Sequence, residues 1–330
     1  MKVVIESKIP FISGVLEPLG IDVEYIDPDR ITPEAVRDAD ALIVRTRTRC
    51  DAALLDGSRV SFVATATIGT DHLDLPYLRS RSITVANAPG CNAPAVAQYV
   101  WSVVNTLLPG RSLTVGVVGV GHVGSIVARW GWSMGHTILC CDPPRAEAEG
   151  HDGFVALDEI AYRADVVTLH TPMTRDGYHA TYHMIDNALL QSLQRKPLLI
   201  NSARGPVVDT AAVVDALDSR ALCAAAIDTW EGEPAIDRRL LQLAAIATPH
   251  IAGYSLEGKK RATTMVLDAL TRHFGLPRVT IADPAPLAIP DSVTPETLGY
   301  NPMADTMRLK ADPTAFEALR NNYHLRNEPK

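Results

Sequence analysis

The apolar residues of this chain fall into short runs that alternate with segments of helical periodicity. In the first part of the chain, the runs predict β-strands at residues 2–5, 23–26, 41–44, 62–65 and 83–86. Further runs predict strands at residues 113–118, 137–141, 166–170, 198–201, 224–228 and 245–248. Helical segments, among them 11–19, 92–108 and 255–274, lie between these runs. Strands that alternate with helices predict an α/β protein with parallel sheets and crossover helices.

The apolar run that ends at Val118 leads directly into three glycines, Gly119, Gly121 and Gly124. The G-x-G-x-x-G spacing between a strand and a helix is typical of a dinucleotide-binding turn, in which the helix N-terminus faces the pyrophosphate. The next apolar run ends at Asp142, 23 residues after Gly119, where an acid can bind the adenosine ribose 2′-OH. The motif by itself is also compatible with an ordinary tight turn, but its context favours a Rossmann domain.

Breaks in the pattern suggest domain boundaries. Pro89-Gly90 interrupts the first series of strands, so we expect the first part of a substrate domain over residues 1–92 and a Rossmann domain over 93–252. A helix over 253–275 is expected to return to the substrate domain. The proline-rich composition after Gly275 predicts an arm, and residues 276–330 are expected to be a C-terminal extension, a shortened dimerisation region, with one helix between Thr314 and Arg326.

Composition narrows the possible partners. The 330 residues carry a formal net charge of −7 without a basic block, which disfavours nucleic acid and anionic membranes as partners. Five cysteines without a C-x-x-C pair predict a reducing compartment and no metal site. No apolar run approaches the roughly 18 residues of a membrane span. These features together predict a cytoplasmic protein.

Each predicted strand after Asp142 is followed by a polar cluster. The clusters are His170-Thr171-Pro172, Asn201–Gly205, Asp228–Pro234 and Pro249–Tyr254. Ligands of doubly wound sheets bind beyond the carboxyl ends of the strands, so an arginine, acids and a histidine at these ends suggest a catalytic site. These residue types suit hydride transfer to a nicotinamide. A histidine can exchange the proton, a carboxylate can orient the imidazole, and an arginine can bind an anionic substrate.

Six segments carry a resemblance to a known family. They are residues 65–72 (TATIGTDH), 88–93 (APGCNA), 142–145 (DPPR), 201–205 (NSARG), 228–234 (DTWEGEP) and 250–258 (HIAGYSLEG). Over about residues 1–275 the chain resembles the D-isomer-specific 2-hydroxyacid dehydrogenases. This resemblance implies two doubly wound parallel-sheet domains, a Rossmann NAD domain and a flavodoxin-like substrate domain, with a short C-terminal arm. It also implies an enzyme that uses NAD, and a homodimer.

The resemblance further implies roles for individual residues. Arg204, Glu233 and His250 correspond to the catalytic residues, and Thr46, Thr67 and Tyr254 to substrate contacts. The cofactor-binding positions would be Gly119, Gly121, His122, Val123, Gly124, Asp142, Thr171, Ser202, Ala203, Arg204, Asp228 and Gly253. The likeness is greatest to enzymes that oxidise 4-phospho-D-erythronate to 2-oxo-3-hydroxy-4-phosphobutanoate in pyridoxal 5′-phosphate biosynthesis. That substrate is a phosphorylated 2-hydroxy acid.

Two other functions fit the same sequence. One is oxidation of a different 2-hydroxy acid, such as phosphoglycerate or glycerate, by the same residues. The other is a non-catalytic NAD-sensing binding protein, because a fold does not determine an activity. Retention of an arginine, an acid and a histidine together disfavours the second. The arginines at 45, 47 and 49 are compatible either with a solvated loop or with phosphate binding.

Overall fold

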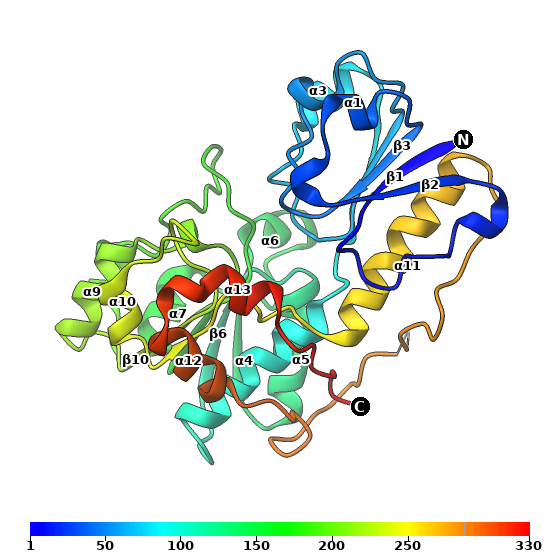
Figure 1. The fold of residues 1–330 in the computed structure, drawn as a ribbon. Coiled ribbons are helices and arrows are strands. Elements are labelled where there is room, and N and C mark those ends of the chain that lie inside the picture. Colours follow the sequence, from blue (N-terminus) through cyan, green and yellow to red (C-terminus); the bar gives the residue numbers. More distant parts are fainter. Residues whose placement is uncertain (287) are drawn as a thin grey trace. The chain divides into compact units, whose positions relative to one another are not determined.

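The computed structural model describes residues 1–286 and 288–330 and divides the chain into two compact units (Figure 1). Unit 1 comprises Met1–Asn92 and the residues from Ser255 to 286, and unit 2 comprises Ala93–Tyr254 and residues 288–330. Each unit contains one parallel sheet covered by helices. Two doubly wound α/β domains, as expected from the sequence, are therefore present.

Unit 1 is built on a five-stranded sheet in the order β2-β1-β3-β4-β5. Its strands are β1 (Lys2–Glu6), β2 (Asp22–Ile26), β3 (Ala41–Val44), β4 (Phe62–Thr65) and β5 (Thr84–Ala86). Its helices are α1 (Pro33–Val36), α2 (Ala52–Leu55), α3 (Leu75–Ser80) and α11 (Leu256–His273), with 3-10 turns η1 (Glu17–Leu19) and η2 (Pro28–Arg30). Successive side chains of β1 point to opposite faces of the sheet, so Val3 and Ile5 pack in one hydrophobic core and Val4 packs in another. Helix α11 covers the face that contains Val3 and Ile5.

The expected helix over residues 11–19 is reduced to the single turn η1. Phe11 and Gly14 adopt positive φ angles of 64° and 76°, which are outside the right-handed helical region. The helix predicted from residue 255 is present as α11, and the Ser255 hydroxyl caps it by accepting from the Gly258 N–H at 2.9 Å.

Unit 2 contains a six-stranded parallel sheet in the order β11-β10-β9-β8-β6-β7. Its strands are β6 (Thr114–Val118), β7 (Thr137–Cys141), β8 (Val166–Leu169), β9 (Leu198–Asn201), β10 (Ala224–Ile227) and β11 (Ile246–Ala247). The main helices are α4 (Ala93–Leu107), α5 (His122–Ser133), α6 (Pro143–Glu149), α7 (Leu157–Arg163), α8 (Asn187–Ser192), α9 (Thr210–Asp218) and α10 (Arg238–Leu243), and η3 spans Gly205–Val207. Strand β6 pairs with β7 on one side and β8 on the other, so the strand order reverses beside β6. Ligands of such sheets bind at this switch point.

The C-terminal segment differs from its prediction. Residues 276–286 belong to unit 1, whereas 288–330 belong to unit 2, so the expected extension is divided between the two. In place of one helix over 314–326, the chain forms α12 (Pro302–Ala311), the 3-10 turn η4 (Pro313–Ala315) and α13 (Phe316–Asn321). Pro313 cannot continue α12, which explains the break.

Helix α12 completes the edge of the unit 2 sheet next to β11. The Ala247 N–H donates to the Thr306 hydroxyl at 3.1 Å, and Lys310 Nζ donates to the Ala244 carbonyl at 2.6 Å. Leu309 and Phe316 are buried in the same core as the strands. The segment is thus part of the domain, because it buries apolar surface and satisfies backbone groups at the sheet edge.

The segment also covers helix α4 and the buried face of α5. Val293 and Leu298 pack in the core that contains Trp101 and Trp130, and Trp130 Nε1 donates to the Pro290 carbonyl at 2.8 Å. Helix α4 and Trp130 are therefore covered by the chain's own C-terminal residues. Among the described residues, no helix is both long and apolar enough to cross a membrane.

Candidate active site and dinucleotide-binding turn

The three glycines after β6 have distinct steric environments. Gly119 has a φ of +87°, and a Cβ there would lie 2.8 Å from backbone atoms of His170 and Thr171. A Cβ on Gly124 would lie 2.0 Å from the Gly119 carbonyl oxygen, whereas one on Gly121 would meet no atom within 4 Å. Gly119 and Gly124 are therefore required for internal packing. Gly121 borders open space, as expected where a backbone must approach a pyrophosphate.

Asp142 lies where a dinucleotide ribose would be recognised. Its side chain accepts from the Val120 N–H in the glycine turn at 2.7 Å and from the Arg145 N–H at 3.2 Å, so it also caps α6. Arg145 could offset this negative charge, but its guanidinium forms a bidentate ion pair with Glu149, at 2.8 and 2.6 Å. A carboxylate beside the turn favours the 2′-OH of NAD over the 2′-phosphate of NADP.

Thr171 and Ser202, which were also predicted to bind the cofactor, carry hydroxyl groups that can hydrogen-bond to a ligand. Thr171 Oγ1 and Ser202 Oγ are buried, and neither has a hydrogen-bond partner within residues 1–286 and 288–330. Buried polar groups are normally satisfied, so these atoms fit a site that holds a polar cofactor. His122 and Val123 form the start of α5, and His122 is exposed. Taken together with Gly121, these groups are compatible with NAD.

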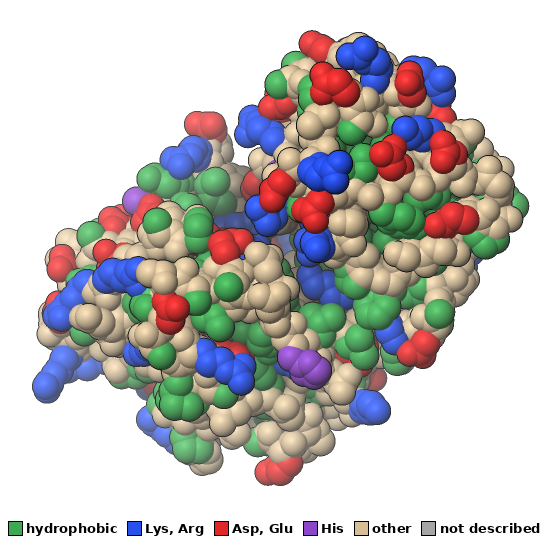
Figure 2. Space-filling model, in the orientation of Figure 1, with side chains coloured by type: hydrophobic (Ala, Val, Ile, Leu, Met, Phe, Trp, Pro, Cys, Tyr) green, Lys and Arg blue, Asp and Glu red, His purple; other side chains and the backbone are tan. Residues whose placement is uncertain are grey.

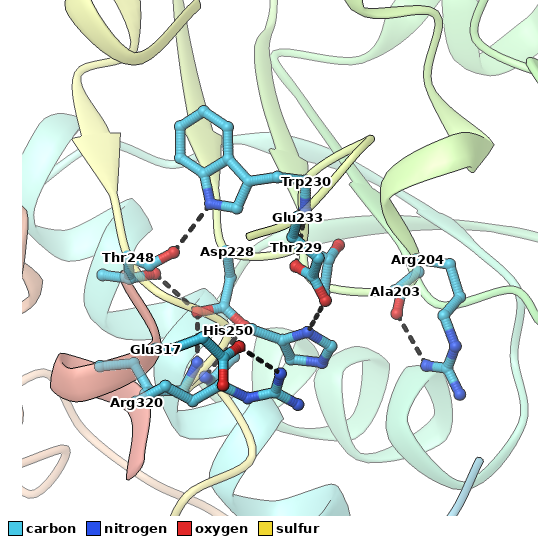
Figure 3. Close-up of polar contacts among 12 residues, drawn as sticks. Ala203, Arg204, Asp228, Thr229, Trp230, Glu233, Thr248, His250, Glu317 and Arg320 are labelled. Atoms are coloured by element: carbon cyan, nitrogen blue, oxygen red, sulfur yellow. Dashed lines mark hydrogen bonds and ion pairs between the residues drawn. The ribbon is translucent and has the colours of Figure 1, made fainter. Parts of the chain in front are cut away.

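Glu233 and His250 form a hydrogen-bonded pair (Figure 3). His250 Nδ1 lies 2.6 Å from Glu233 Oε1, and the Trp230 N–H donates to Glu233 Oε2 at 3.3 Å. Burial by itself would raise the pKa of Glu233, but the hydrogen bond and charge of His250, with smaller effects of Arg320 and the Trp230 N–H, lower that pKa overall. An ionised carboxylate can only accept, so Nδ1 carries a hydrogen and the neutral ring keeps Nε2 as a proton acceptor.

The backbone that carries His250 is held by a buried carboxylate. His250 has a φ of 57°, a left-handed conformation that non-glycine residues seldom adopt. Its N–H donates to the Asp228 carbonyl at 2.9 Å. The Asp228 side chain accepts from the N–H groups of Ile251 at 2.8 Å and Ala252 at 3.0 Å, and from the Thr248 hydroxyl at 2.7 Å. Burial raises the pKa of Asp228, while His250 and these donors oppose that rise.

Asp228 was expected to contact the cofactor, and in the structure its carboxylate oxygens are engaged by the loop after His250. Asn201, which the sequence motif contained but which we did not single out, has a similar role for the arginine loop. Its Nδ2 donates to the Arg204 carbonyl at 3.1 Å, and its Oδ1 accepts from the Ala203 N–H at 3.2 Å. Both residues organise the backbone from which the catalytic side chains project.

Arg204 follows β9 and precedes η3. Its Nη1 donates to the Ala203 carbonyl at 2.9 Å (Figure 3). His170, which follows the neighbouring strand β8, is a poor alternative to His250, because burial lowers the pKa of its ring to about 3. A ring that stays neutral at such low pH cannot act as an acid near neutrality.

Two arginines of the C-terminal segment were missed by sequence reasoning. Arg326 donates to the carbonyl groups of Ile251 at 3.0 Å and Tyr254 at 3.1 Å, and also to that of Ala252. Arg320 Nε donates to the Tyr254 hydroxyl at 3.2 Å. Nothing in the local pattern identified them, since they are more than 60 residues from the loop they contact. Tyr254 and Gly253 lie within that loop.

The remaining predicted substrate contacts belong to unit 1. Thr46 is exposed just after β3, and Thr67 follows the adjacent strand β4, where its hydroxyl lies 2.7 Å from that of Thr65. The nearby arginines are ion-paired: Arg45 with the buried Glu6 at 2.6 Å, Arg47 with Asp29 at 3.1 Å and Arg49 with Asp51 at 2.8 Å. Figure 2 shows acidic and basic side chains interspersed over unit 1. These pairings favour a structural role for the three arginines.

Comparisons with known proteins agree with this arrangement. Residues 97–252 match the family model of the D-isomer specific 2-hydroxyacid dehydrogenase, NAD binding domain. The structure is similar to D-lactate dehydrogenase from Aquifex aeolicus in complex with NAD and lactic acid, with a TM-score of 0.70 and 26% identity over 83% of this chain and 95% of that one. It is also similar to the TT0316 protein from Thermus thermophilus, with a TM-score of 0.72 and 26% identity over 85% and 100% of the two chains.

Curated relatives extend the match over the whole chain. An erythronate-4-phosphate dehydrogenase of Bacteroides thetaiotaomicron is 44% identical over 100% of this chain and 98% of its own length. One from Chromohalobacter salexigens is 46% identical over 84% of this chain and 73% of its own length.

The dinucleotide turn, the histidine–carboxylate pair and the arginine define an NAD-dependent oxidoreductase of the doubly wound class. The chain belongs to the D-isomer specific 2-hydroxyacid dehydrogenase family. The predictions of an NAD-dependent enzyme with this fold are thereby confirmed.

The glycine turn yields a matched pair of variants. Gly124→Ala should destabilise the protein by about 1–3 kcal/mol or more, because its Cβ would overlap the Gly119 carbonyl. Gly121→Ala should leave the unfolding midpoint unchanged but weaken NADH binding, because its methyl group would stand in the space of the pyrophosphate. Thermal unfolding and fluorescence titration with NADH measure the two effects. Native NADH affinity in Gly121→Ala would contradict this assignment.

The Glu233–His250 pair predicts effects of Glu233→Gln on stability and on turnover. A lowered carboxyl pKa contributes stability that is present above the usual pKa of glutamate and is lost as the pH falls through the folded value. The native protein should thus be more stable than Glu233→Gln above about pH 5, and this difference should vanish in acid. Without the carboxylate charge, the imidazolium that forms during oxidation loses its counter-charge, so kcat for oxidation should fall while NADH affinity stays native. Native kcat in Glu233→Gln would remove the pair from the mechanism.

Proposed function

We propose that this chain oxidises the C2 hydroxyl of 4-phospho-D-erythronate and forms 2-oxo-3-hydroxy-4-phosphobutanoate for pyridoxal 5′-phosphate biosynthesis. The observation that carries the proposal is the full-length similarity, at 44% identity, to proteins named erythronate-4-phosphate dehydrogenase. The 2.6 Å contact between His250 and Glu233 supports the chemistry, because oxidation of an alcohol requires a proton acceptor near neutrality.

In this reaction Arg204 binds the substrate carboxylate through its planar guanidinium and polarises the developing C2 carbonyl. His250 Nε2 accepts the proton of the C2 hydroxyl, while Glu233 holds the ring through Nδ1 and stabilises the imidazolium that forms. NAD, when bound, accepts the C2 hydride with its two electrons. The substrate thereby loses one proton and one hydride, which balances its oxidation to the 2-oxo acid.

Tyr254, Thr46 and Thr67 are proposed to contact the substrate. Tyr254 is supported by its place four residues after His250 and by its hydrogen bond to Arg320. Thr46 and Thr67 follow adjacent parallel strands, and the carboxyl ends of such strands are where ligands of doubly wound sheets bind.

A substrate panel tests the proposed function. NADH formation should be fastest, as kcat/KM, with 4-phospho-D-erythronate, and slower with 3-phospho-D-glycerate, D-glycerate and D-lactate. His250→Gln should lower turnover by ~10²–10⁴-fold while NADH still binds, since general acid–base help is of that size. A higher kcat/KM for phosphoglycerate or glycerate would replace the proposed substrate. Absence of turnover with every acid would favour an NAD-sensing protein.

We also propose that the chain assembles as a homodimer through unit 2. The side chain of Trp132 on α5 is 58% exposed, and tryptophan is enriched among the residues that contribute most to protein interfaces. Near the ends of α4 and α5, a pocket of about 340 Å³ has apolar residues in its lining, including Val104, Leu108 and Met134. Light scattering should give twice the 35.6 kDa chain mass, and Trp132→Lys should reduce it. A native monomer at micromolar concentration would contradict the proposal.

A cytoplasmic location is proposed as well. It is supported by five cysteines between which no disulfide forms among the described residues. Recovery of the protein in an oxidising compartment on cell fractionation would contradict it.

A further inference from the structure

Arg320 brings a second guanidinium to the catalytic site from the C-terminal helix α13. Its Nε donates to the Tyr254 hydroxyl at 3.2 Å, and its side chain is only 18% exposed. Burial by itself would lower the pKa of Arg320, but Tyr254, Glu233 and Glu317 raise it overall. The side chain is therefore a partly buried, permanent cation beside the acid–base pair.

The carboxylate nearest to Arg320 holds it only loosely. Arg320 Nη1 lies 3.7 Å from Glu317 Oε1, and the Glu317 side chain is 44% exposed. Charge-assisted hydrogen bonds between guanidinium and carboxylate are about 2.7–2.9 Å long. Glu233 attracts Arg320 electrostatically, but its two oxygens already accept from His250 and the Trp230 N–H.

This situation differs from that of the arginines in unit 1. Arg45 contacts the buried carboxylate of Glu6 at 2.6 Å, and Arg49 contacts Asp51 at 2.8 Å. A buried cation without a close counter-charge is costly unless another anion approaches it. Arg320 therefore has the environment expected of an anion-binding group, whereas Arg45 has that of a structural ion pair.

We propose that Arg320 binds the phosphate group of the substrate. This inference rests on the proposed function. Figure 3 shows the guanidinium groups of Arg204 and Arg320 at different places around the His250 ring. In 4-phospho-D-erythronate the reacting C2 lies between two anions, the C1 carboxylate and the C4 phosphate. With C2 at His250 and the carboxylate at Arg204, the phosphate extends towards Arg320.

The chemistry of arginine suits this role. Its planar guanidinium presents donors that match phosphate oxygens in pairs, and a partly buried position strengthens the attraction. Tyr254 accepts from Nε and so orients the guanidinium. The C-terminal segment would consequently determine which 2-hydroxy acid is selected, while the Rossmann core performs the hydride transfer.

The test compares Arg320→Met with the matched control Arg308→Met, whose arginine lies on α12 and is 67% exposed. Arg320→Met should raise KM for 4-phospho-D-erythronate by about 10- to 100-fold, the usual effect of losing a hydrogen-bonded charge. Its kcat/KM for unphosphorylated D-erythronate should fall by a much smaller factor, so the preference for the phosphorylated substrate should drop by about 10-fold or more. Inhibition by inorganic phosphate should weaken in parallel, and Arg308→Met should behave as native in every assay.

Arg320→Lys provides a second variant that keeps the charge without the planar fork, and it should recover part of the lost affinity. This variant and the phosphate inhibition constant of the native enzyme remain informative if Arg320→Met does not fold. If native enzyme does not favour the phosphorylated substrate over D-erythronate, the proposed function and this inference both fail. If native enzyme favours it and Arg320→Met retains that preference, the inference alone fails. Equal losses for both substrates with a shifted pH profile would assign Arg320 to positioning the Glu233–His250 pair instead.

Discussion

The catalytic site depends on one buried carboxylate, that of Asp228. It accepts two backbone N–H groups and one hydroxyl from the segment around His250, and the Asp228 carbonyl accepts the His250 N–H. These bonds keep His250 in a left-handed conformation, which would otherwise cost of the order of 1–3 kcal/mol. The imidazole is thereby directed to Glu233, and the acid–base pair is held in a defined geometry, as pre-organised catalysis requires.

The C-terminal segment supports the same loop from the other side. Arg326 binds three of its carbonyl groups, and its guanidinium also stacks over the Tyr300 ring at 4.4 Å. The loop therefore donates N–H groups to Asp228 and accepts from Arg326 through its carbonyl groups, which satisfies the polar groups that a buried backbone must pair. Residues far along the chain thus also contribute to the acid–base geometry.

Separate roles for the Rossmann core and the C-terminal segment offer a physical account of substrate specificity within the family. Hydride transfer needs the glycine turn, Arg204, Glu233 and His250. The same residues can serve the oxidation of any 2-hydroxy acid, because the reacting group is the same. Discrimination between acids needs contacts with the part of the substrate beyond C2. A cation supplied by α13 can provide such a contact without any change to the sheet.

The sequence by itself determined the parallel α/β architecture, the glycine turn with Asp142, and the polar clusters at strand ends that contain Glu233 and His250. These features are encoded locally, by apolar runs, by glycine spacing and by polar residues at strand ends that parallel topology brings together. Only the tertiary structure decided that Asp228 holds the His250 loop, that Trp130 is buried beneath Pro290, and that Arg320 and Arg326 reach the site. Each of these outcomes joins residues distant in the chain through packing of the C-terminal segment or burial of a charge. No local periodicity records such contacts, because they depend on which surfaces the folded domain leaves to be covered.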